Sequence, residues 1–220
     1  MTLVIAVDGP AGSGKSSAAK GAARALGLRY LDTGSMYRAM TWWMLHHRVR
    51  VDDPDAVAAA AATPVIEVGT DPDAPSVSVD GTDVSAPIRT REVSNSVSAV
   101  ASVPAVRRRL VDLQREIIEA GGIVVEGRDI GSVVAPAAEL KIFLTASEQV
   151  RAQRRARDLV ADPAASVDVT LAEQARRDRL DSTRKDSPLA KADDAVEVDS
   201  TALGLDEVIE TIVRLAKERQ

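Results

Sequence analysis

Apolar runs and amphipathic segments alternate along most of this chain of 220 residues. Short apolar runs bounded by glycine or polar residues are typical of strands that a parallel sheet buries on both faces. Apolar positions spaced three and four residues apart predict helices with one buried face. Strands are therefore predicted over residues 3–7, 29–32, 123–125, 140–144 and 195–199. Helices are predicted over residues 16–25, 35–47, 93–101, 104–120 and 205–219, with two more between 147 and 184. This alternation predicts an α/β fold.

Residues 63–92 interrupt the alternation of strand and helix. The segments 65–68 and 76–79 are rich in β-branched residues, and Asp80-Gly81 is a strong signal for a tight hairpin turn. They follow a short alanine-rich helix that is predicted to begin at Pro54. We expect a small antiparallel insert here, placed as an accessory lobe over the substrate.

A glycine-rich loop joins the first predicted strand to the first predicted helix. Its sequence from Gly9 to Ser16 fits the pattern G-x-x-x-x-G-K-[ST]. Glycines let successive backbone N–H groups surround a phosphate, and the helix that follows adds its positive N-terminal end. A chance glycine-rich turn would not have both flanking elements in place, so the chain is predicted to bind a nucleoside triphosphate. Lys15 is expected to reach the β- and γ-phosphates, and the Ser16 hydroxyl is expected to hold Mg²⁺. The predicted ATP-binding residues of the loop are Gly9, Pro10, Ala11, Gly12, Ser13, Gly14, Lys15, Ser16 and Ser17.

Two further segments follow the carboxyl ends of predicted strands, which is where open α/β sheets bind ligands. Residues 32–38 contain Arg38, which is a candidate to clamp a phosphate. Residues 126–129 read Glu-Gly-Arg-Asp and would face the glycine loop. Acidic residues beside an arginine at this edge of the sheet favour a functional site, and the alternative interpretation is a surface salt bridge.

Arginine is concentrated in the two helices predicted between residues 147 and 184. Ser147 is expected to cap the first helix, and Thr170 with Glu173 is expected to form a capping box that starts the second. Such a helical hairpin predicts a lid that closes over polyphosphate and supplies the cations that phosphoryl transfer needs. The alternative is a solvated arginine-rich face. The first helix carries Arg151, Arg154, Arg155 and Arg157, and the second carries Arg176, Arg177, Arg179, Asp181 and Arg184.

The composition narrows the chemistry. The chain is 45% hydrophobic and 28% charged, as expected of one globular α/β domain. It has no cysteine, which excludes disulfides, thiolate metal sites and a cysteine nucleophile. The adjacent His46 and His47 cannot make a zinc site alone, so magnesium held by oxygen atoms is the remaining metal.

Charge and hydropathy bear on partners and location. The formal net charge of −5 argues against broad nucleic-acid binding. No apolar run approaches the roughly 18 residues that a membrane span requires, and the chain starts directly on a strand without a charged leader. We therefore expect a cytoplasmic protein with no membrane or nucleic-acid partner. No feature indicates a protein partner, and we expect a monomer.

A set of motifs, in its order along the chain, resembles the bacterial cytidylate kinases, a branch of the nucleoside monophosphate kinases. The motifs are residues 9–16, 31–38, 88–93, 126–131 and 177–189. The resemblance implies a three-layer P-loop NTPase fold with a five-stranded parallel sheet, an antiparallel insert in the monophosphate-binding region and a helical lid. It also implies a single kinase domain over residues 1–220. Its parts would be a core of residues 1–34, 104–150 and 188–220, a monophosphate-binding region of about 35–103, and a lid of about 151–187.

The activity implied by this resemblance is the phosphorylation of CMP and dCMP to CDP and dCDP by ATP with Mg²⁺. Catalytic roles are implied for Lys15, Arg128, Arg155 and Arg184, and contact with ATP is implied for Arg151. The implied CMP-binding residues are Thr33; Arg38, Arg128 and Arg184 at the phosphate; Arg177 and Asp181 at the sugar; and Ser98, Arg107 and Asp129 at the base.

The chemistry of cytosine agrees with these base contacts. A carboxylate accepts from the N4 amine while arginine and serine donate to the acceptors on the same edge. Uracil carries an oxygen in place of the amine, so two hydrogen-bond acceptors, this oxygen and the Asp129 carboxylate, would face and repel each other. Two positions depart from the family pattern: Thr33 stands where some relatives have serine, and Glu126 stands where others have aspartate. Thr33 keeps the hydroxyl, and the assignment is unchanged.

Two alternatives to a CMP kinase remain. A nucleotide-dependent switch of the GTPase type would read guanine through an N-K-x-D segment, which the sequence lacks. A P-loop kinase for UMP, shikimate or a sugar acid would share the glycine loop. The antiparallel insert and the pair of Arg107 and Asp129 weigh against that second alternative.

Overall fold

The computed structural model describes residues 3–158, 167–184 and 187–219 of the chain. A five-stranded parallel sheet forms its centre, in the order β2-β6-β1-β7-β8. The strands are β1 (Val4–Asp8), β2 (Arg29–Asp32), β6 (Ile123–Gly127), β7 (Leu140–Thr145) and β8 (Val196–Asp199). Neighbouring strands β1 and β6 are in register, with Asp8 opposite Gly127. The five predicted strands and the α/β fold are confirmed.

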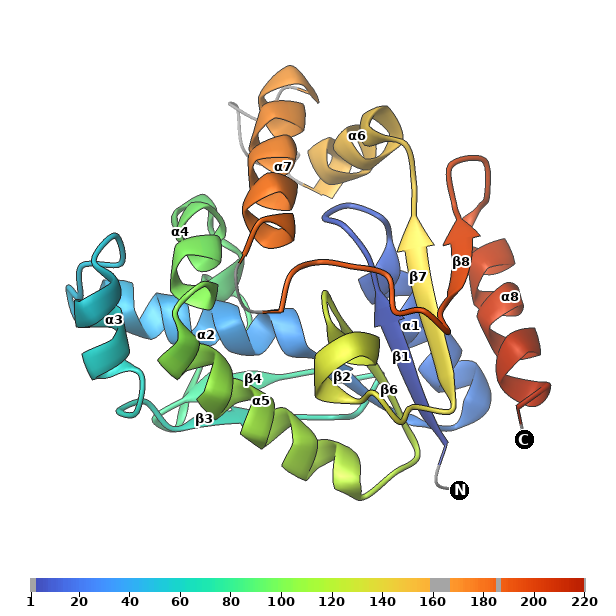
Figure 1. Ribbon diagram of the computed structural model, residues 1–220, viewed down its shortest axis with the longest axis horizontal. Helices are drawn as coiled ribbons and strands as arrows, with labels where there is room; N and C mark the ends of the chain where they lie inside the picture. The colour runs from blue at the N-terminus through green and yellow to red at the C-terminus, as the bar shows by residue number, and fades with distance from the viewer. Residues whose placement is uncertain (1–2, 159–166, 185–186, 220) are drawn as a thin grey trace.

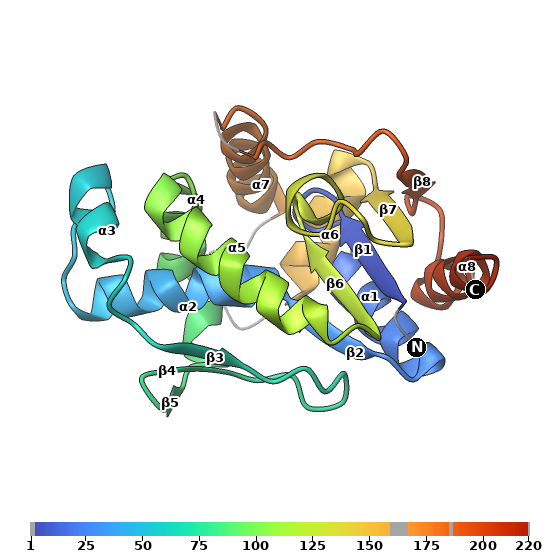
Figure 2. The same ribbon diagram turned by 60° about the horizontal axis from the view of Figure 1, so that its bottom comes forward.

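Helices cover both faces of the sheet and give three layers (Figures 1 and 2). The side chains of β1 alternate between two hydrophobic cores, one on each face of the sheet, since Ile5 and Val7 belong to one core and Ala6 to the other. The helices α1 (Lys15–Leu26) and α8 (Leu205–Lys217) pack on the first face, and α2 (Thr33–His46) and α5 (Pro104–Glu119) on the second. In the described part of the chain, no helix combines the length and hydrophobicity that a membrane span requires.

The predicted antiparallel sheet is confirmed, whereas its expected place over the substrate stays a prediction. After α3 (Pro54–Ala60) the chain forms the three-stranded sheet of β3 (Ile66–Val68), β4 (Val77–Val79) and β5 (Thr82–Asp83). A 3₁₀ turn, η1 (Pro87–Arg89), and the helix α4 (Arg91–Ala101) follow. Asp80 anchors the hairpin turn to α2, because its carboxylate accepts hydrogen bonds from Trp43 Nε1 at 2.7 Å and from the Val65 N–H at 2.8 Å.

Two arginine-rich helices lie above the carboxyl edge of the sheet (Figure 1). They are α6 (Glu148–Asp158) and α7 (Val167–Ser182). The Ser147 hydroxyl accepts from the Val150 N–H at 3.4 Å, as predicted for a cap. The prediction that α7 starts at a capping box on Thr170 is wrong, because α7 already begins at Val167; the side chain of Thr170 lies outside the described residues. Arg184 follows the end of α7 instead of belonging to it.

Other boundaries also differ from the predicted ones. The helix α2 begins at Thr33 because the Asp32 side chain caps it, accepting from the Ser35 N–H at 3.0 Å. The strand β6 runs on to Gly127, which places Glu126 inside the sheet. A short π-helix, η2 (Ile130–Val134), was not predicted.

Asp8 connects the end of β1 to the first turn of η2. Its carboxylate accepts hydrogen bonds from the N–H groups of Ile130 and Gly131, both at 2.8 Å. The side chain is buried, and this burial raises the pKa of Asp8 to about 6. The bonds from Ile130 and Gly131 therefore satisfy the N–H groups that open the π-helix and hold it against the sheet.

The raised pKa predicts a pH dependence for the Asp8→Asn variant. The folded state takes up the Asp8 proton at a higher pH than the unfolded state, so this group favours folding less as the pH rises from about 4 to about 6. Asparagine does not titrate. We expect the loss of unfolding free energy caused by Asp8→Asn to be larger at pH 4.5 than at pH 7.5, by about 2 kcal/mol. Urea denaturation of both proteins at the two pH values measures this, with circular dichroism as the control for folding. A loss that is equal at both pH values, or larger at pH 7.5, would contradict the prediction.

Candidate active site

A cavity of about 670 Å³ opens at the carboxyl edge of the sheet, where the glycine loop, α2, α4, α7 and the start of α8 meet. It contains side chains from both ends of the chain. Of the residues predicted to bind ATP or CMP, those that line it are Ala11, Gly12, Ser13, Gly14, Lys15, Ser16, Ser17, Thr33, Arg38, Ser98, Arg107, Arg128, Asp129, Arg177, Asp181 and Arg184. The fold thus brings the predicted donor and acceptor residues to one space.

The glycine loop has a backbone that side chains would strain. Gly12 and Gly14 have φ angles of +75° and +87°, and a Cβ at Gly12 would lie 2.5 Å from Nε2 of Gln174. Gly14 is also the N-cap of α1 and has no side chain that could accept from the first helical turn. The N–H groups of this turn can therefore bind an anion. Pro10 is not among the lining residues, and its carbonyl oxygen accepts from Nζ of Lys15 at 3.2 Å.

Lys15 lies in a dense group of charges at the base of the cavity. Burial, followed by the positive charge of Arg128, lowers the pKa of Lys15 to about 8, against the opposing effect of Glu126. Glu126 is 2% exposed and accepts a hydrogen bond from the Tyr30 hydroxyl at 3.0 Å. Burial and the neighbouring Asp32 raise the pKa of Glu126, whereas Lys15 and a hydrogen bond with Ser16 lower it.

This group of residues contains oxygen atoms that suit Mg²⁺. A magnesium ion bound mainly by phosphate and water needs only one or two protein oxygens. The Ser16 hydroxyl and the Glu126 carboxylate can supply such a pair, since both line the cavity and Ser16 influences the pKa of Glu126. Among the described residues, no three His, Cys, Asp or Glu side chains are grouped so that they could hold a metal ion alone. The donor set therefore fits Mg²⁺ bound together with a nucleotide.

Arg107 and Asp129, both predicted to bind the acceptor, form a buried ion pair in the lining of the cavity. They are 4% and 5% exposed, and the Arg107 guanidinium carbon lies 5.6 Å from the centre of the Tyr37 ring. Burial raises the pKa of Asp129, and the charges of Arg107 and Arg184 act in the opposite direction. The carboxylate is thus held in place by a cation that can itself donate to a ligand.

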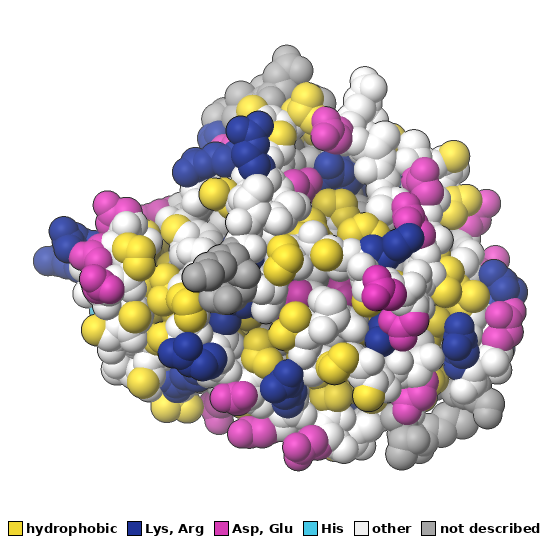
Figure 3. Space-filling view, in the orientation of Figure 1, with side chains coloured by type: hydrophobic (Ala, Val, Ile, Leu, Met, Phe, Trp, Pro, Cys, Tyr) yellow, Lys and Arg dark blue, Asp and Glu magenta, His cyan; other side chains and the backbone are white. Residues whose placement is uncertain are grey.

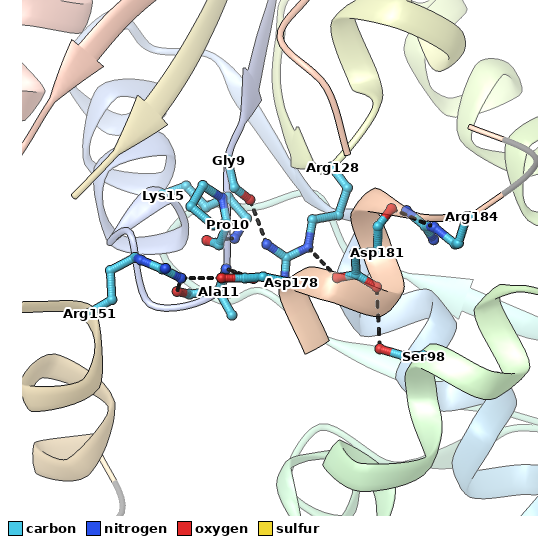
Figure 4. Close-up of polar contacts among 10 residues, drawn as sticks. All are labelled: Gly9, Pro10, Ala11, Lys15, Ser98, Arg128, Arg151, Asp178, Asp181 and Arg184. Atoms are coloured by element: carbon cyan, nitrogen blue, oxygen red, sulfur yellow. Dashed lines mark hydrogen bonds and ion pairs between the residues drawn. The ribbon is translucent and has the colours of Figure 1, made fainter. Parts of the chain in front are cut away.

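Arg128 links the glycine loop to residues that are predicted to bind the acceptor (Figure 4). Its Nη1 donates to the carbonyl oxygen of Gly9 at 2.5 Å, and its Nε lies 3.2 Å from Oδ2 of Asp181. The other oxygen of Asp181 accepts from the Ser98 hydroxyl at 3.3 Å, and the Asp181 carbonyl accepts from Nε of Arg184 at 3.2 Å. These contacts place Ser98, Arg128, Asp181 and Arg184 in one hydrogen-bonded network.

Arg38 and Thr33 are oriented by the backbone around them. Nη1 of Arg38 donates to the Ile88 carbonyl at 3.1 Å and to the Ser94 hydroxyl at 2.9 Å, which ties α2 to η1 and α4. The Thr33 hydroxyl donates to the carbonyl oxygen of Glu126 at 2.8 Å. Thr33 therefore connects the start of α2 to β6.

Two arginines of α6, Arg151 and Arg155, have roles in the prediction, and the structure describes the side chain of only the first. Arg151, predicted to contact ATP, is not among the residues that line the cavity. Its Nη1 is bound to the carbonyl oxygen of Ala11, at 2.9 Å, and to the carboxylate of Asp178. The side chain of Arg155, predicted to be catalytic, lies outside the described residues.

Among the side chains of α6 that the structure describes, Arg154 lines the cavity. Its Nη1 donates to the carbonyl oxygen of Ser13 at 3.2 Å and to the hydroxyl of Ser200 at 2.9 Å, and its Nη2 donates to the Ser200 carbonyl at 2.8 Å. The sequence singled out Arg154 only as one of four arginines on this helix. It contains no signal that separates Arg154 from Arg151, because the two share one helical face and their partners lie far away in the chain.

Exposed basic side chains of α7 lie above this site. Figure 3 shows lysine and arginine side chains over α7, whereas basic and acidic side chains are mixed over the rest of this face. The exposed Arg176 and Arg179 belong to α7. The same helix also carries four acidic residues against three arginines, so its charge is mixed and not net positive.

Comparisons with known proteins agree with this arrangement. The sequence profile of the family described as cytidylate kinase matches residues 5–218. The cytidylate kinase of Streptomyces avermitilis is 55% identical, with 99% of this chain and 94% of the relative covered, and that of Streptomyces coelicolor is 56% identical with the same coverage. The crystal structure of an uncharacterized protein from Eubacterium ventriosum matches 99% of both chains with a TM-score of 0.54 and 11% identity, which supports the fold alone. The profile match and the identities show that this chain belongs to the cytidylate kinase family.

Proposed function

We propose that this protein transfers the γ-phosphoryl group of ATP to CMP or dCMP and releases ADP with CDP or dCDP. Besides membership of the family, one observation carries the proposal. A single cavity contains both a glycine loop that fits a triphosphate and the buried pair of Arg107 and Asp129, which fits the pairing edge of cytosine. The two alternatives from the sequence would need only the first of these features.

The donor half of the site would bind the phosphates of ATP. The N–H groups of the loop that are not bonded within the protein, and those of the first turn of α1, would donate to the phosphate oxygens, and Lys15 would offset the charge on the transferred group. We infer that Ser16 and Glu126 hold Mg²⁺ with the nucleotide. The bound ion would neutralise charge on the β- and γ-phosphates.

The acceptor half would bind the monophosphate. Arg38, Arg128 and Arg184 are proposed to clamp its phosphate, since all three line the cavity and guanidinium groups grip phosphate with two parallel hydrogen bonds. The CMP phosphate is already ionised near neutral pH, so the reaction needs no general base. The residues therefore act by orientation and charge stabilisation.

The base would be read by Ser98, Arg107 and Asp129. The ionised Asp129 accepts from the N4 amine of cytosine, and Arg107 and Ser98 donate to the acceptors of the ring. The Arg107 charge favours the ionised form of Asp129, against the effect of burial. The lid of about residues 151–187 would exclude water, and Arg177 and Asp181 would contact the sugar.

One chain supplies every residue of this proposed site, so we propose that a monomer is sufficient for activity. ATP and CMP are metabolites of the cytoplasm, and we therefore place the protein there.

The release of ADP in a coupled assay tests the function. The purified protein is mixed with ATP and, separately, with CMP, dCMP, UMP, AMP or no acceptor. We expect the highest kcat/KM with CMP and dCMP, a value at least about tenfold lower with UMP, and negligible hydrolysis without an acceptor. EDTA should abolish the activity, and added Mg²⁺ should restore it. A fastest reaction with another acceptor would contradict the proposed substrate, and a rate unchanged by EDTA would contradict the role of Mg²⁺.

A further inference from the structure

Asp178 on α7 holds the glycine loop from outside the cavity (Figure 4). Its Oδ1 accepts a hydrogen bond from the Ala11 N–H at 3.1 Å, and its Oδ2 forms an ion pair with Arg151. Asp178 is not among the residues that line the cavity. It is therefore placed to act on the loop and not on a bound nucleotide.

Arg151 binds the same residue of the loop, Ala11, through its carbonyl oxygen. Its Nη1 donates to the Ala11 carbonyl at 2.9 Å, so the N–H and the C=O of Ala11 are both held by one ion pair. The Arg151 side chain is 8% exposed, and its Nε is fixed by the Ala146 carbonyl at 3.2 Å. Gln174 on α7 also donates to the Arg151 carbonyl, at 3.3 Å. A pair so shielded from water keeps the conformation of Ala11 coupled to the positions of both α6 and α7.

The helix that carries Asp178 also carries acceptor residues of the cavity. Arg177 precedes Asp178 in the chain, and Asp181 is almost one helical turn further on. Asp181 contacts Ser98 of α4 and Arg128, and Arg128 reaches the Gly9 carbonyl. Two bridges thus join α7 to the glycine loop, one at Gly9 and one at Ala11.

We propose that Asp178 is a positioning residue that couples the two substrate sites, so that ATP and CMP each strengthen the binding of the other. This inference rests on the proposed function. A nucleotide monophosphate that contacts Arg177, Asp181 and Arg184 fixes the position of α7, and Asp178 then fixes the Ala11 peptide in the loop that receives ATP. Any free energy that is needed to align α7 with the loop is needed once for both ligands, which makes the effect reciprocal. A carboxylate that merely satisfies the Ala11 N–H would change stability without changing this coupling.

Titration calorimetry of CMP, with and without a saturating non-hydrolysable ATP analogue, tests the coupling. For the unmodified protein we expect the analogue to lower the Kd of CMP by about tenfold. Asp178→Asn keeps an oxygen for the Ala11 N–H and loses the ion pair with Arg151. We expect the analogue to lower the Kd of CMP less than about twofold in this variant, and the Kd of CMP alone to change little. Asp112→Asn makes the same chemical change at an exposed position of α5 and should leave the tenfold effect in place.

A steady-state measurement separates this role from a structural one. In Asp178→Asn the KM for CMP at saturating ATP should rise towards the Kd of CMP measured alone, whereas a loss of folded protein would lower the apparent kcat without raising this KM. If Asp178→Asn proves unfolded by circular dichroism, Arg151→Gln breaks the same ion pair and should show the same loss of coupling.

The outcomes are distinct. Retained coupling in a folded Asp178→Asn or Arg151→Gln variant would overturn the inference, and so would the absence of coupling in the unmodified protein. A protein that fails to bind CMP at all would overturn the proposed function itself.

Discussion

Replacing Lys15 by alanine is expected to lower kcat by about 10³-fold or more, the size of effect seen when a main charge-stabilising group is removed from a phosphoryl-transfer site. Lys15 is the cation of the glycine loop and lies near Glu126 and Arg128. We propose that its ammonium group stabilises the transferred phosphoryl group in the transition state more than in the ground state, so its loss should reduce kcat more than it raises KM. Steady-state kinetics with varied ATP and CMP measure both effects.

The fold should tolerate the Lys15→Ala change. Glu126 would keep its hydrogen bond with Tyr30, and no apolar core is opened. We expect a thermal transition close to that of the unmodified protein and unchanged binding of CMP by calorimetry. Lys217→Ala is the matched control, because Lys217 is exposed at the end of α8, and it should keep full activity. A Lys15→Ala protein that retains more than a tenth of the original kcat would exclude the proposed role.

The second large effect is expected at the base. Asp129→Asn should raise the KM for CMP about 100-fold, because the N4 amine loses a charged acceptor inside a buried site. The KM for ATP should change less than about threefold and is the internal control. Asparagine also offers an N–H donor, which suits the O4 oxygen of uracil. The ratio of kcat/KM between CMP and UMP should therefore fall.

The thermal stability of the Asp129→Asn variant has to be measured together with its kinetics. Asp129→Asn leaves the Arg107 charge buried without its ionic partner, and breaking a buried pair costs about 3–5 kcal/mol. The asparagine oxygen can still accept from Arg107, so we expect a lower thermal transition and a folded protein. An Asp129→Asn protein whose KM rises for ATP and not for CMP would remove Asp129 from the acceptor site.

The sequence predicts the strands of this protein well because their side chains are buried on both faces. Ile123, Val124 and Val125 of β6 alternate between two apolar cores, so the whole strand is apolar and easy to recognise. The glycine loop is also predictable, since its pattern follows from the chemistry of phosphate binding. The π-helix η2 has no comparable pattern, because its first N–H groups depend on Asp8 at the end of a distant strand.

The candidate site is only partly predictable from the sequence. The residues predicted to bind ATP follow from one local motif, whereas those predicted to bind CMP follow from a resemblance that is spread over the chain. Long-range partners determine the rest. Arg151 and Arg154 look alike in the sequence, and only the packing of α6 against Asp178 and Ser200 decides which of them reaches the cavity. No local pattern encodes such pairs.

The register of β1 and β6 fixes the distance between two segments of the site. Asp8 lies opposite Gly127, so the glycine loop and the segment with Arg128 and Asp129 leave neighbouring strands at the same level. Adjacent strands are held about 4.8 Å apart by their backbone hydrogen bonds. The separation between the donor and acceptor segments is thus set by the main chain and is independent of side-chain identity. Substitutions in the residues that are proposed to read the base should then change which acceptor is chosen while the two reacting phosphates keep their alignment.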